Sequence, residues 1–211
     1  MFQNLSFDEL NMLVKNKRSM PFEKYFGEMS LPEDDKSERI HMAEDLEDIF
    51  IVIMTLLFTM AQVNKIDYEL VRKKIEDAYT SVAKKYVDVD MRLSVYIKDF
   101  SYEVIDSTKK HKAEPYYYSL DRAKYIAENE VNTVINYVRY MEATNSGKTM
   151  KRWESIIDGV TRKDHREING KYIPIGQAFH VGDSWLLFPK DTSLGASPNQ
   201  IVNCRCSIIY L

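Results

Sequence analysis

Cysteine is scarce in this chain of 211 residues: Cys204 and Cys206 are the only two, and a single residue separates them. A disulfide between them would close a very small and strained ring, which argues against a fold held together by disulfides. We therefore expect them to be free thiols, metal ligands or small buried side chains.

Long apolar segments and a strong net charge are also missing. The longest apolar run, residues 49–61, is shorter than the roughly 20 residues of a membrane-spanning helix and is predicted to be a buried helix. The N-terminal residues do not show the pattern of a secretory signal, so we expect folding in a reducing cytosol and no membrane partner. A formal net charge of −3 argues against a surface built throughout for nucleic acid.

Glycine is nearly absent from the first two-thirds of the chain. Gly27 alone precedes Gly147, and the other five glycines follow it. Residues 1–145 carry a net charge of −6 and residues 146–211 a net charge of +3, so composition changes at the same point. Because glycine marks turns, we predict an N-terminal arm (1–37), a helical region (38–145) and a turn-rich C-terminal domain (146–211).

Apolar residues three and four positions apart predict helices in four places, over residues 46–60, 71–86, 93–104 and 127–141. Helices over residues 38–62 and 122–143, rich in Met, Tyr and Ile, would provide interaction faces for a partner, although apolar stripes of this kind are more often internal core. Breaks are expected at Pro32, at residues 87–90 and at Pro115, and Ser119 can cap the last helix. The first 30 residues are interpreted as an arm or a short helix.

The C-terminal part has the pattern of short strands separated by turns. Strands are predicted over residues 151–157, 171–175, 184–188 and 204–210, with a helical turn over residues 161–167. The fold class is therefore α+β, with a short antiparallel sheet in the C-terminal domain.

Polar residues in this part form an ordered set. Its members are Trp153, Asp158, Thr161, Arg162, His165, Gly170, Asn203, Cys204, Arg205 and Cys206. On one strand, Cys204 and Cys206 would point to the same face, because side chains alternate with period two. With His165, and Asp158 as a fourth ligand, they would make a site for zinc. The alternative is that the thiols pack in a small core and His165 bonds a backbone carbonyl. We predict that Asp158, Arg162, His165, Cys204 and Cys206 cluster in space.

Two of these residues also have simple structural interpretations. Asp158 precedes Gly159 and can form a turn that caps the following helix. Arg162 can form an ion pair with Asp158 or Glu167 that serves the scaffold.

Taken in order, these motifs resemble a known family. They are Glu130 and Asn136, Gly147, Lys151-Arg152-Trp153, Asp158, Thr161-Arg162, His165, Asn169-Gly170, Phe188-Pro189-Lys190-Asp191 and Asn203-Cys204-Arg205-Cys206. Over residues 122–210 the chain resembles the C-terminal domain of the Mu-type phage minor head proteins, also called head morphogenesis proteins. It departs from the family's usual Tyr-Pro-Gly-Asp at residues 188–191 and from its usual Thr-Glu at Asn129-Glu130.

The resemblance implies a protein of the virion head, present in the host cytoplasm during assembly, that acts in head morphogenesis and in genome packaging or ejection. Its implied partners are the portal protein, the major capsid protein and a second copy of the chain. Related members carry Cys-x2-Cys near residues 161–165 and a His before the closing Cys-x-Cys, and an exchange of Cys for His is expected of metal ligands. The family's N-terminal region is helical and variable, so it is expected to carry partner contacts.

Three other interpretations remain open at this point. A mildly basic tail could touch packaged DNA through Lys148, Lys151, Arg152, Arg162 and Lys163. A toxin-like enzyme could use His165 with Cys204 as a nucleophilic pair, or Asp164, His165 and His180 as a metal-dependent nuclease site. The enzyme requires these groups to be open to a cleft, whereas a structural role expects them to be buried. A membrane-active protein would use residues 49–61.

Overall fold

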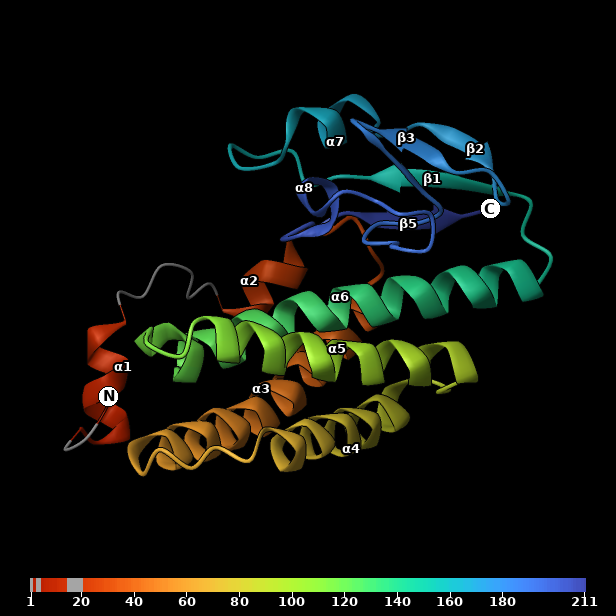
Figure 1. Ribbon diagram of the computed structural model, residues 1–211. Coiled ribbons are helices and arrows are strands. Elements are labelled where there is room, and N and C mark those ends of the chain that lie inside the picture. The colour runs from red at the N-terminus through yellow and green to blue at the C-terminus, as the bar shows by residue number, and fades with distance from the viewer. Residues whose placement is uncertain (1, 3–4, 15–20) are drawn as a thin grey trace. The chain divides into compact units, whose positions relative to one another are not determined.

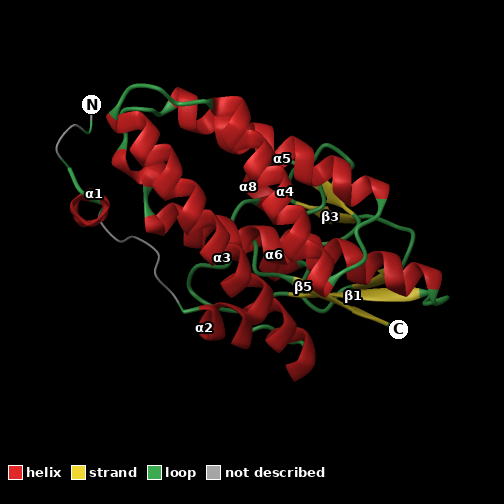
Figure 2. Cartoon of the chain, turned by 90° about the horizontal axis from the view of Figure 1, so that it is seen from below, coloured by secondary structure: helices red, strands yellow, loops and turns green. Residues whose placement is uncertain are grey.

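The computed structural model describes residues 2, 5–14 and 21–211, and it divides the chain into two compact units. Unit 1 comprises Met1–Met20 and His41–Ala127, and unit 2 comprises Pro21–Ile40 and Glu128–Leu211. Each unit is described by itself. Helices predominate, and the strands of the described residues all belong to unit 2, which makes the protein α+β as predicted (Figures 1 and 2).

Unit 1 is helical. It contains α1 (Phe7–Leu13), most of α3 (Glu33–Gln62), α4 (Tyr68–Tyr86), α5 (Met91–Lys110), a 3₁₀ turn (Pro115–Tyr118) and the first residues of α6 (Leu120–Asn145). Side chains cap the helices where the sequence breaks: Asp90 accepts from the backbone of Leu93, and Ser119 from that of Arg122. The predicted helix boundaries at residues 87–90 and at Ser119 are therefore confirmed.

The apolar run of α3 lies in the core of unit 1. Phe50, Met54 and Leu57 are fully buried, and Phe100 packs edge-on against Phe50 and Tyr79. Residues 49–61 thus form the buried helix that their length predicted. Among the described residues, no helix is long and apolar enough to cross a membrane.

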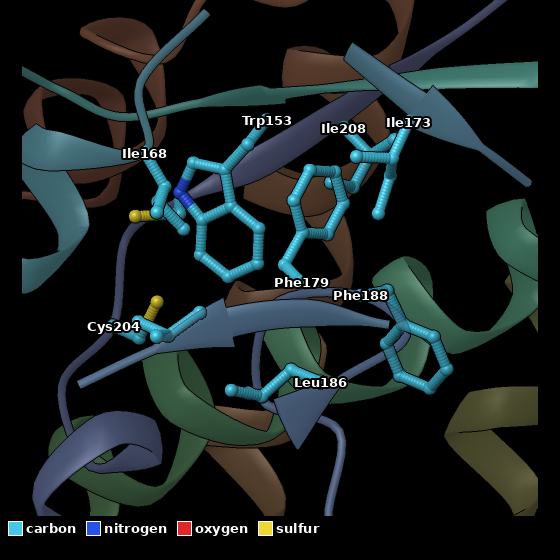
Figure 3. Close-up of a cluster of buried hydrophobic side chains, with 10 residues drawn as sticks. Trp153, Ile168, Ile173, Phe179, Leu186, Phe188, Cys204 and Ile208 are labelled. Carbon is cyan, nitrogen blue, oxygen red and sulfur yellow. The ribbon is translucent and has the colours of Figure 1, made fainter. Parts of the chain in front are cut away.

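Unit 2 places two small sheets beside helices. It contains α2 (Phe22–Gly27), the start of α3, most of α6, β1 (Met150–Glu154), α7 (Lys163–Glu167), β2 (Tyr172–Pro174), β3 (Phe179–Val181), β4 (Ser184–Leu186), α8 (Pro198–Ile201) and β5 (Ser207–Tyr210). The antiparallel sheet has the order β2-β1-β5, and β3 pairs with β4 in a hairpin. Trp153 in β1 is fully buried against Phe179 of the hairpin, so the two sheets share one core (Figure 3).

The structure differs from the predicted elements at the last strand, at two short unpredicted elements and at the N-terminal segment. Cys204 and Cys206 do not lie in the last strand, which begins at Ser207. The strand Phe179–Val181 and the short helix Pro198–Ile201 were not predicted. The N-terminal segment contains two short helices, α1 and α2, rather than one. The division into 1–37, 38–145 and 146–211 stays a prediction, because the two compact units follow packing and both include part of α3 and of α6.

Lys151 is an unusual member of the unit 2 core. It is fully buried, donates from Nζ to the carbonyl of Leu187 at 2.6 Å, and lies over the rings of Tyr140 and Phe179. Burial lowers the pKa of this ammonium to about 8, against the opposing charge of Asp191. Folding therefore lowers the pH at which Lys151 loses its proton.

This burial predicts a pH dependence of stability. Because the pKa of Lys151 is lower in the folded state than in the unfolded state, its contribution to stability should rise as pH increases from about 8 to about 10.5. Relative to Lys151→Met, the wild type should gain on the order of 2 kcal/mol of unfolding free energy between about pH 7.5 and about pH 10. Urea unfolding of both proteins at each pH measures this gain, since other titrating groups cancel in the difference. Equal pH dependence in the two proteins would contradict the prediction.

Candidate metal centre

Three potential metal ligands meet in the core of unit 2. His165 comes from α7, and Cys204 and Cys206 come from the segment between α8 and β5. The Nδ1 atom of His165 lies 3.3 Å from the Sγ atom of Cys206 and 3.6 Å from that of Cys204. All three side chains are about 2% exposed, and their donor atoms lie within 4.8 Å of one another. The predicted meeting of His165 with the two cysteines is confirmed.

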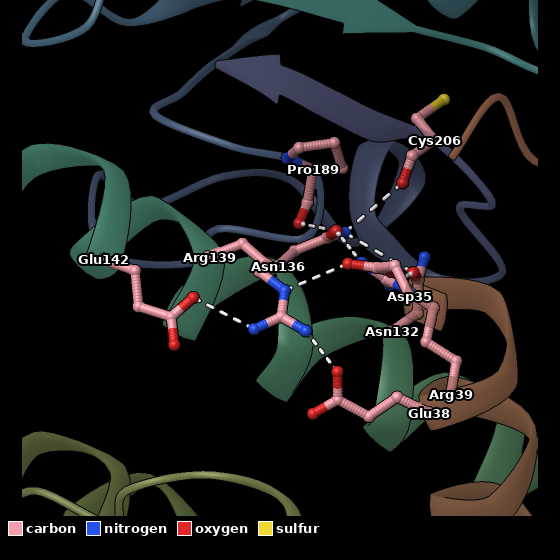
Figure 4. A network of polar contacts seen from close by, with 9 residues as sticks. All are labelled: Asp35, Glu38, Arg39, Asn132, Asn136, Arg139, Glu142, Pro189 and Cys206. Atoms are coloured by element: carbon pink, nitrogen blue, oxygen red, sulfur yellow. Dashed lines mark hydrogen bonds and ion pairs between the residues drawn. The ribbon is translucent and has the colours of Figure 1, made fainter. Parts of the chain in front are cut away.

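Helix α6, rather than a neighbouring strand, holds the cysteine segment. The side-chain amide of Asn132 donates to the carbonyl of Cys204 at 2.7 Å. That of Asn136 donates to the carbonyl of Cys206 at 3.3 Å, as Figure 4 shows. Both asparagines are buried, and they stand one helical turn apart. The two sulfurs therefore lie close together although Cys204 and Cys206 are not part of a paired strand, as the sequence had suggested they would be.

A buried arginine in turn fixes the two asparagines. Arg39 of α3 donates to the Oδ1 atoms of Asn132 at 2.6 Å and of Asn136 at 3.2 Å, and it forms an ion pair with Asp35 (Figure 4). Arg139 joins the network through Asp35 at 3.0 Å. Because an arginine can only donate, the oxygen of each amide faces Arg39 and the nitrogen is left for the cysteine carbonyls.

The other ring nitrogen of His165 also has a defined partner. Its Nε2 atom lies 3.1 Å from Oε1 of Gln200, whose amide nitrogen donates to Asp164 at 2.9 Å. A carboxylate only accepts, so the amide nitrogen of Gln200 must face Asp164 and its oxygen must face His165. The proton of the neutral imidazole then resides on Nε2, and the lone pair of Nδ1 points at the two sulfurs.

Gly182 lets the β3–β4 turn approach this pair of supporting residues. It has a φ of +58°, and a Cβ atom at this position would lie 2.3 Å from both Asp164 and Gln200. A side chain at residue 182 would therefore displace the groups that orient His165.

Ser155 and Trp153 close the site on the side of the sheet. The indole nitrogen of Trp153 donates to Oγ of Ser155 at 3.0 Å, and Ser155 donates to the carbonyl of His165 at 2.8 Å. The Trp153 ring packs edge-on against the imidazole, and Figure 3 shows Cys204 in the same apolar cluster. The group is thus shielded from water on its apolar side.

The electrostatics distinguish the two thiols. A hydrogen bond from Cys206, aided by His165, holds the pKa of Cys204 well below its ordinary value. Burial and the neighbouring Cys204 raise the pKa of Cys206. Burial by itself would lower the pKa of His165, but Cys204 outweighs it and the net shift is upward. Two sulfurs and one imidazole nitrogen converging in a dry pocket are the donors that a soft divalent ion prefers.

Comparison with known families agrees with the motifs of this unit. Residues 71–209 match the family described as Phage Mu protein F like protein. The chain belongs to this family of minor head proteins. No curated protein and no solved structure matches it. The matched region begins about fifty residues earlier than the motifs suggested, so it includes the helices α4 and α5 of this Mu F-like protein.

Asp158 lies outside the group of three donors. Its Oδ1 atom accepts from the backbone of Val160 and Thr161 at 3.1 and 2.8 Å, and its other oxygen pairs with Arg205. Burial alone would raise the pKa of Asp158, but the hydrogen bonds from Thr161 and Arg205 outweigh it and lower this pKa to about 2. The predicted turn at Asp158 is present, but it does not cap the following helix, because α7 has Arg162 at its N-cap and no side-chain hydrogen bond there. Ligation by Asp158 stays a prediction without support from its contacts.

Other motif residues serve the backbone of the same region. Arg162 donates to the carbonyl of Val202, so Arg205 is the partner of Asp158 in place of Arg162. Gly170 has a φ of +73° and donates to the carbonyl of Trp153, and Asn203 has a φ of +55° and donates to Asn129. These residues shape the turns that carry His165 and the cysteines.

The two departures from the usual family motifs contact each other. Lys190, at the position of a usual glycine, has a φ of +70° and donates from a buried Nζ atom to Asn129 at 2.9 Å. Asn129 stands at the position of a usual threonine. Burial lowers the pKa of Lys190, and the charges of Glu130, Cys204 and Glu128 oppose this shift in part. The departures therefore belong to one local arrangement.

Several residues of the alternative enzyme and DNA-binding sites are buried, already paired or not grouped with the others. His180 is exposed and packs on Trp185, so it does not join Asp164 and His165 as a nuclease site would require. His165 and Cys204 are within hydrogen-bonding distance, but both are buried. Of the candidate DNA contacts, Lys151 is buried, Arg152 pairs with Glu154, and Arg162 donates to a carbonyl.

Proposed function

We propose that this Mu F-like protein is a minor head protein that acts in head morphogenesis. The observation that carries the proposal is the family match over residues 71–209, which spans most of both the helical part and the C-terminal unit. The protein would act in the host cytoplasm during assembly and remain in the virion head. Capsid proteins are the partners that the family implies.

The burial of the site supports a structural use of its chemistry. A nucleophilic cysteine must meet its substrate, yet Cys204 and His165 are each about 2% exposed. The groups around them, Asn132, Gln200 and Ser155, hold and orient them from within the core. This arrangement suits a module whose task is to keep its shape.

Our finer proposal is that the portal protein is the direct partner, with the major capsid protein as the second, and that the chain aids packaging or ejection of the genome. Contact with packaged DNA would be limited to non-specific phosphate contacts. Among the described residues of unit 2, the exposed basic side chains that form no salt bridge are Lys24, Lys148, Arg166 and Lys171, whereas Lys163 pairs with Glu167. A second copy of the chain would complete an assembly around the portal.

The test uses the phage that encodes this chain. A stop codon early in the gene should abolish normal heads in electron micrographs and reduce infectious particles, and the wild-type gene supplied in trans should restore both. Mass spectrometry should detect the chain in purified procapsids and heads. Co-expression with the portal protein or with the major capsid protein, followed by gel filtration, identifies the partner. Normal heads without the chain, and its absence from procapsids, would overturn the proposal.

A further inference from the structure

We propose that His165, Cys204 and Cys206 bind one zinc ion as a structural site of unit 2, with His165 coordinating through Nδ1. This inference goes beyond the proposed function, which does not include a metal. It rests on the geometry of three buried side chains and their supporting contacts.

The distances fit a tetrahedral zinc ion. With Zn–S bonds of about 2.3 Å and a Zn–N bond of about 2.0 Å, nitrogen and sulfur ligands of one ion lie about 3.5 Å apart. The Nδ1 atom of His165 lies 3.3 and 3.6 Å from the two sulfurs. A single proton on Nδ1 could serve only one sulfur well, whereas a metal ion accounts for both distances at once.

The second nitrogen of His165 is arranged as in metal sites. Metal-binding histidines donate their other N–H to an acceptor, which fixes the ring and its tautomer. Gln200 provides that acceptor at 3.1 Å from Nε2, and Asp164 fixes the orientation of Gln200. When the imidazole is neutral and its proton is on Nε2, the lone pair of Nδ1 is directed at the sulfurs, where an ion would bind.

Charge balance favours an ion in so dry a place. Two thiolates and a neutral imidazole carry a charge of −2, which a divalent ion cancels, whereas unpaired buried thiolates would be costly. Thiolate and imidazole together select zinc over harder ions such as magnesium or calcium. The buried backbone carbonyls of both cysteines are held by Asn132 and Asn136, so the sulfurs are positioned in advance.

The fourth position would be taken by an oxygen donor such as water. Among the described residues, no further His, Cys, Asp or Glu joins the group. The carboxylate of Asp158 is occupied by Thr161 and Arg205. We therefore expect a coordination set of two sulfurs, one nitrogen and one oxygen.

The first experiment measures zinc in the full chain, expressed with added zinc and purified under reducing conditions without chelator. Mass spectrometry should find one zinc per chain. Replacement by Co²⁺ should give sulfur-to-metal charge-transfer bands and the strong visible bands of a tetrahedral site. Zinc at the buffer background, or Co²⁺ spectra of a six-coordinate ion, would overturn the proposal whatever the variants do.

Variants then assign the ligands. Cys204→Ser combined with Cys206→Ser should abolish zinc binding and the charge-transfer bands. Gln200→Met should weaken zinc affinity about 10- to 100-fold in competition with a chelating dye, because it removes the acceptor that orients His165. Asn199→Ala, an exposed neighbour on the same short helix, is the matched control and should retain wild-type affinity. Unchanged affinity in folded Gln200→Met protein would overturn ligation through Nδ1.

Discussion

Replacing Arg39 with leucine should lower the free energy of unfolding by about 3 kcal/mol. Arg39 is 1% exposed and supplies hydrogen bonds to Asp35, Asn132 and Asn136, all within unit 2. Without it, two buried amide oxygens lose their donor and Asp35 keeps only Arg139 as a partner. Unsatisfied buried groups of this kind are costly, and leucine cannot replace the bonds.

A charge on the same helix supplies the matched control. Lys36, whose side chain is 15% exposed, pairs with Glu33, whose side chain is 88% exposed. Because Glu33 stays in water when Lys36 is removed, Lys36→Leu should change stability by less than about 1 kcal/mol. Urea unfolding of the wild type and both variants, at one pH and salt concentration, gives the comparison. A loss for Arg39→Leu no greater than that for Lys36→Leu would contradict the structural role of the network.

The network also has a defined response to acid. Burial raises the pKa of Asp35, but its pairs with Arg39 and Arg139 outweigh burial and hold the pKa below the ordinary value. The stability from this ionised group is therefore present above its unfolded pKa and is lost as pH falls through the lower folded pKa. In Arg39→Leu, the pKa of Asp35 should move upward, and part of this loss should occur at a higher pH.

Much of the fold could be predicted because its signals are local. Helices α4 and α5 follow from apolar periodicity, and Asp90 and Ser119 mark helix starts by side-chain capping. Short strands were harder: Phe179–Val181 has only three residues, too few for alternation to distinguish a strand from a turn. The sheet order β2-β1-β5 could not be predicted, because pairing joins segments far apart in the sequence.

The candidate site was only partly predictable for the same reason. His165, Cys204 and Cys206 could be recognised as soft donors from residue type alone. The groups that position them could not, since Asn132 lies 72 residues from Cys204 in the sequence and asparagines on a helix give no specific signal. The family resemblance singled out Asn136. For Arg39, the one signal in the sequence is its i, i+4 spacing from Asp35, which is common on helices and does not indicate a site. The sequence allows Asp158 to be either a fourth ligand or a turn residue, and its contacts are those of the turn.

Trp153 should be the most costly single truncation in unit 2. It is fully buried in β1, between Phe179 of the hairpin and the imidazole of His165, and its indole nitrogen donates to Ser155. Trp153→Ala would leave a large cavity between the two sheets and remove the hydrogen bond that the indole donates to Ser155. We expect a loss of about 3–5 kcal/mol of unfolding free energy, measured by urea unfolding.

The second tryptophan makes this prediction specific. Trp185 is 54% exposed, so Trp185→Ala should change stability by less than about 1 kcal/mol. The chain has two tryptophans, so Trp185→Ala also leaves Trp153 as its single tryptophan fluorophore. Trp153 should then emit at short wavelength when folded and shift to longer wavelength on unfolding. Trp153→Phe should recover part of the lost stability, since it refills most of the cavity but cannot donate to Ser155. A solvent-exposed emission spectrum from the folded Trp185→Ala protein, or equal losses for Trp153→Ala and Trp185→Ala, would mean that the two sheets do not close over Trp153.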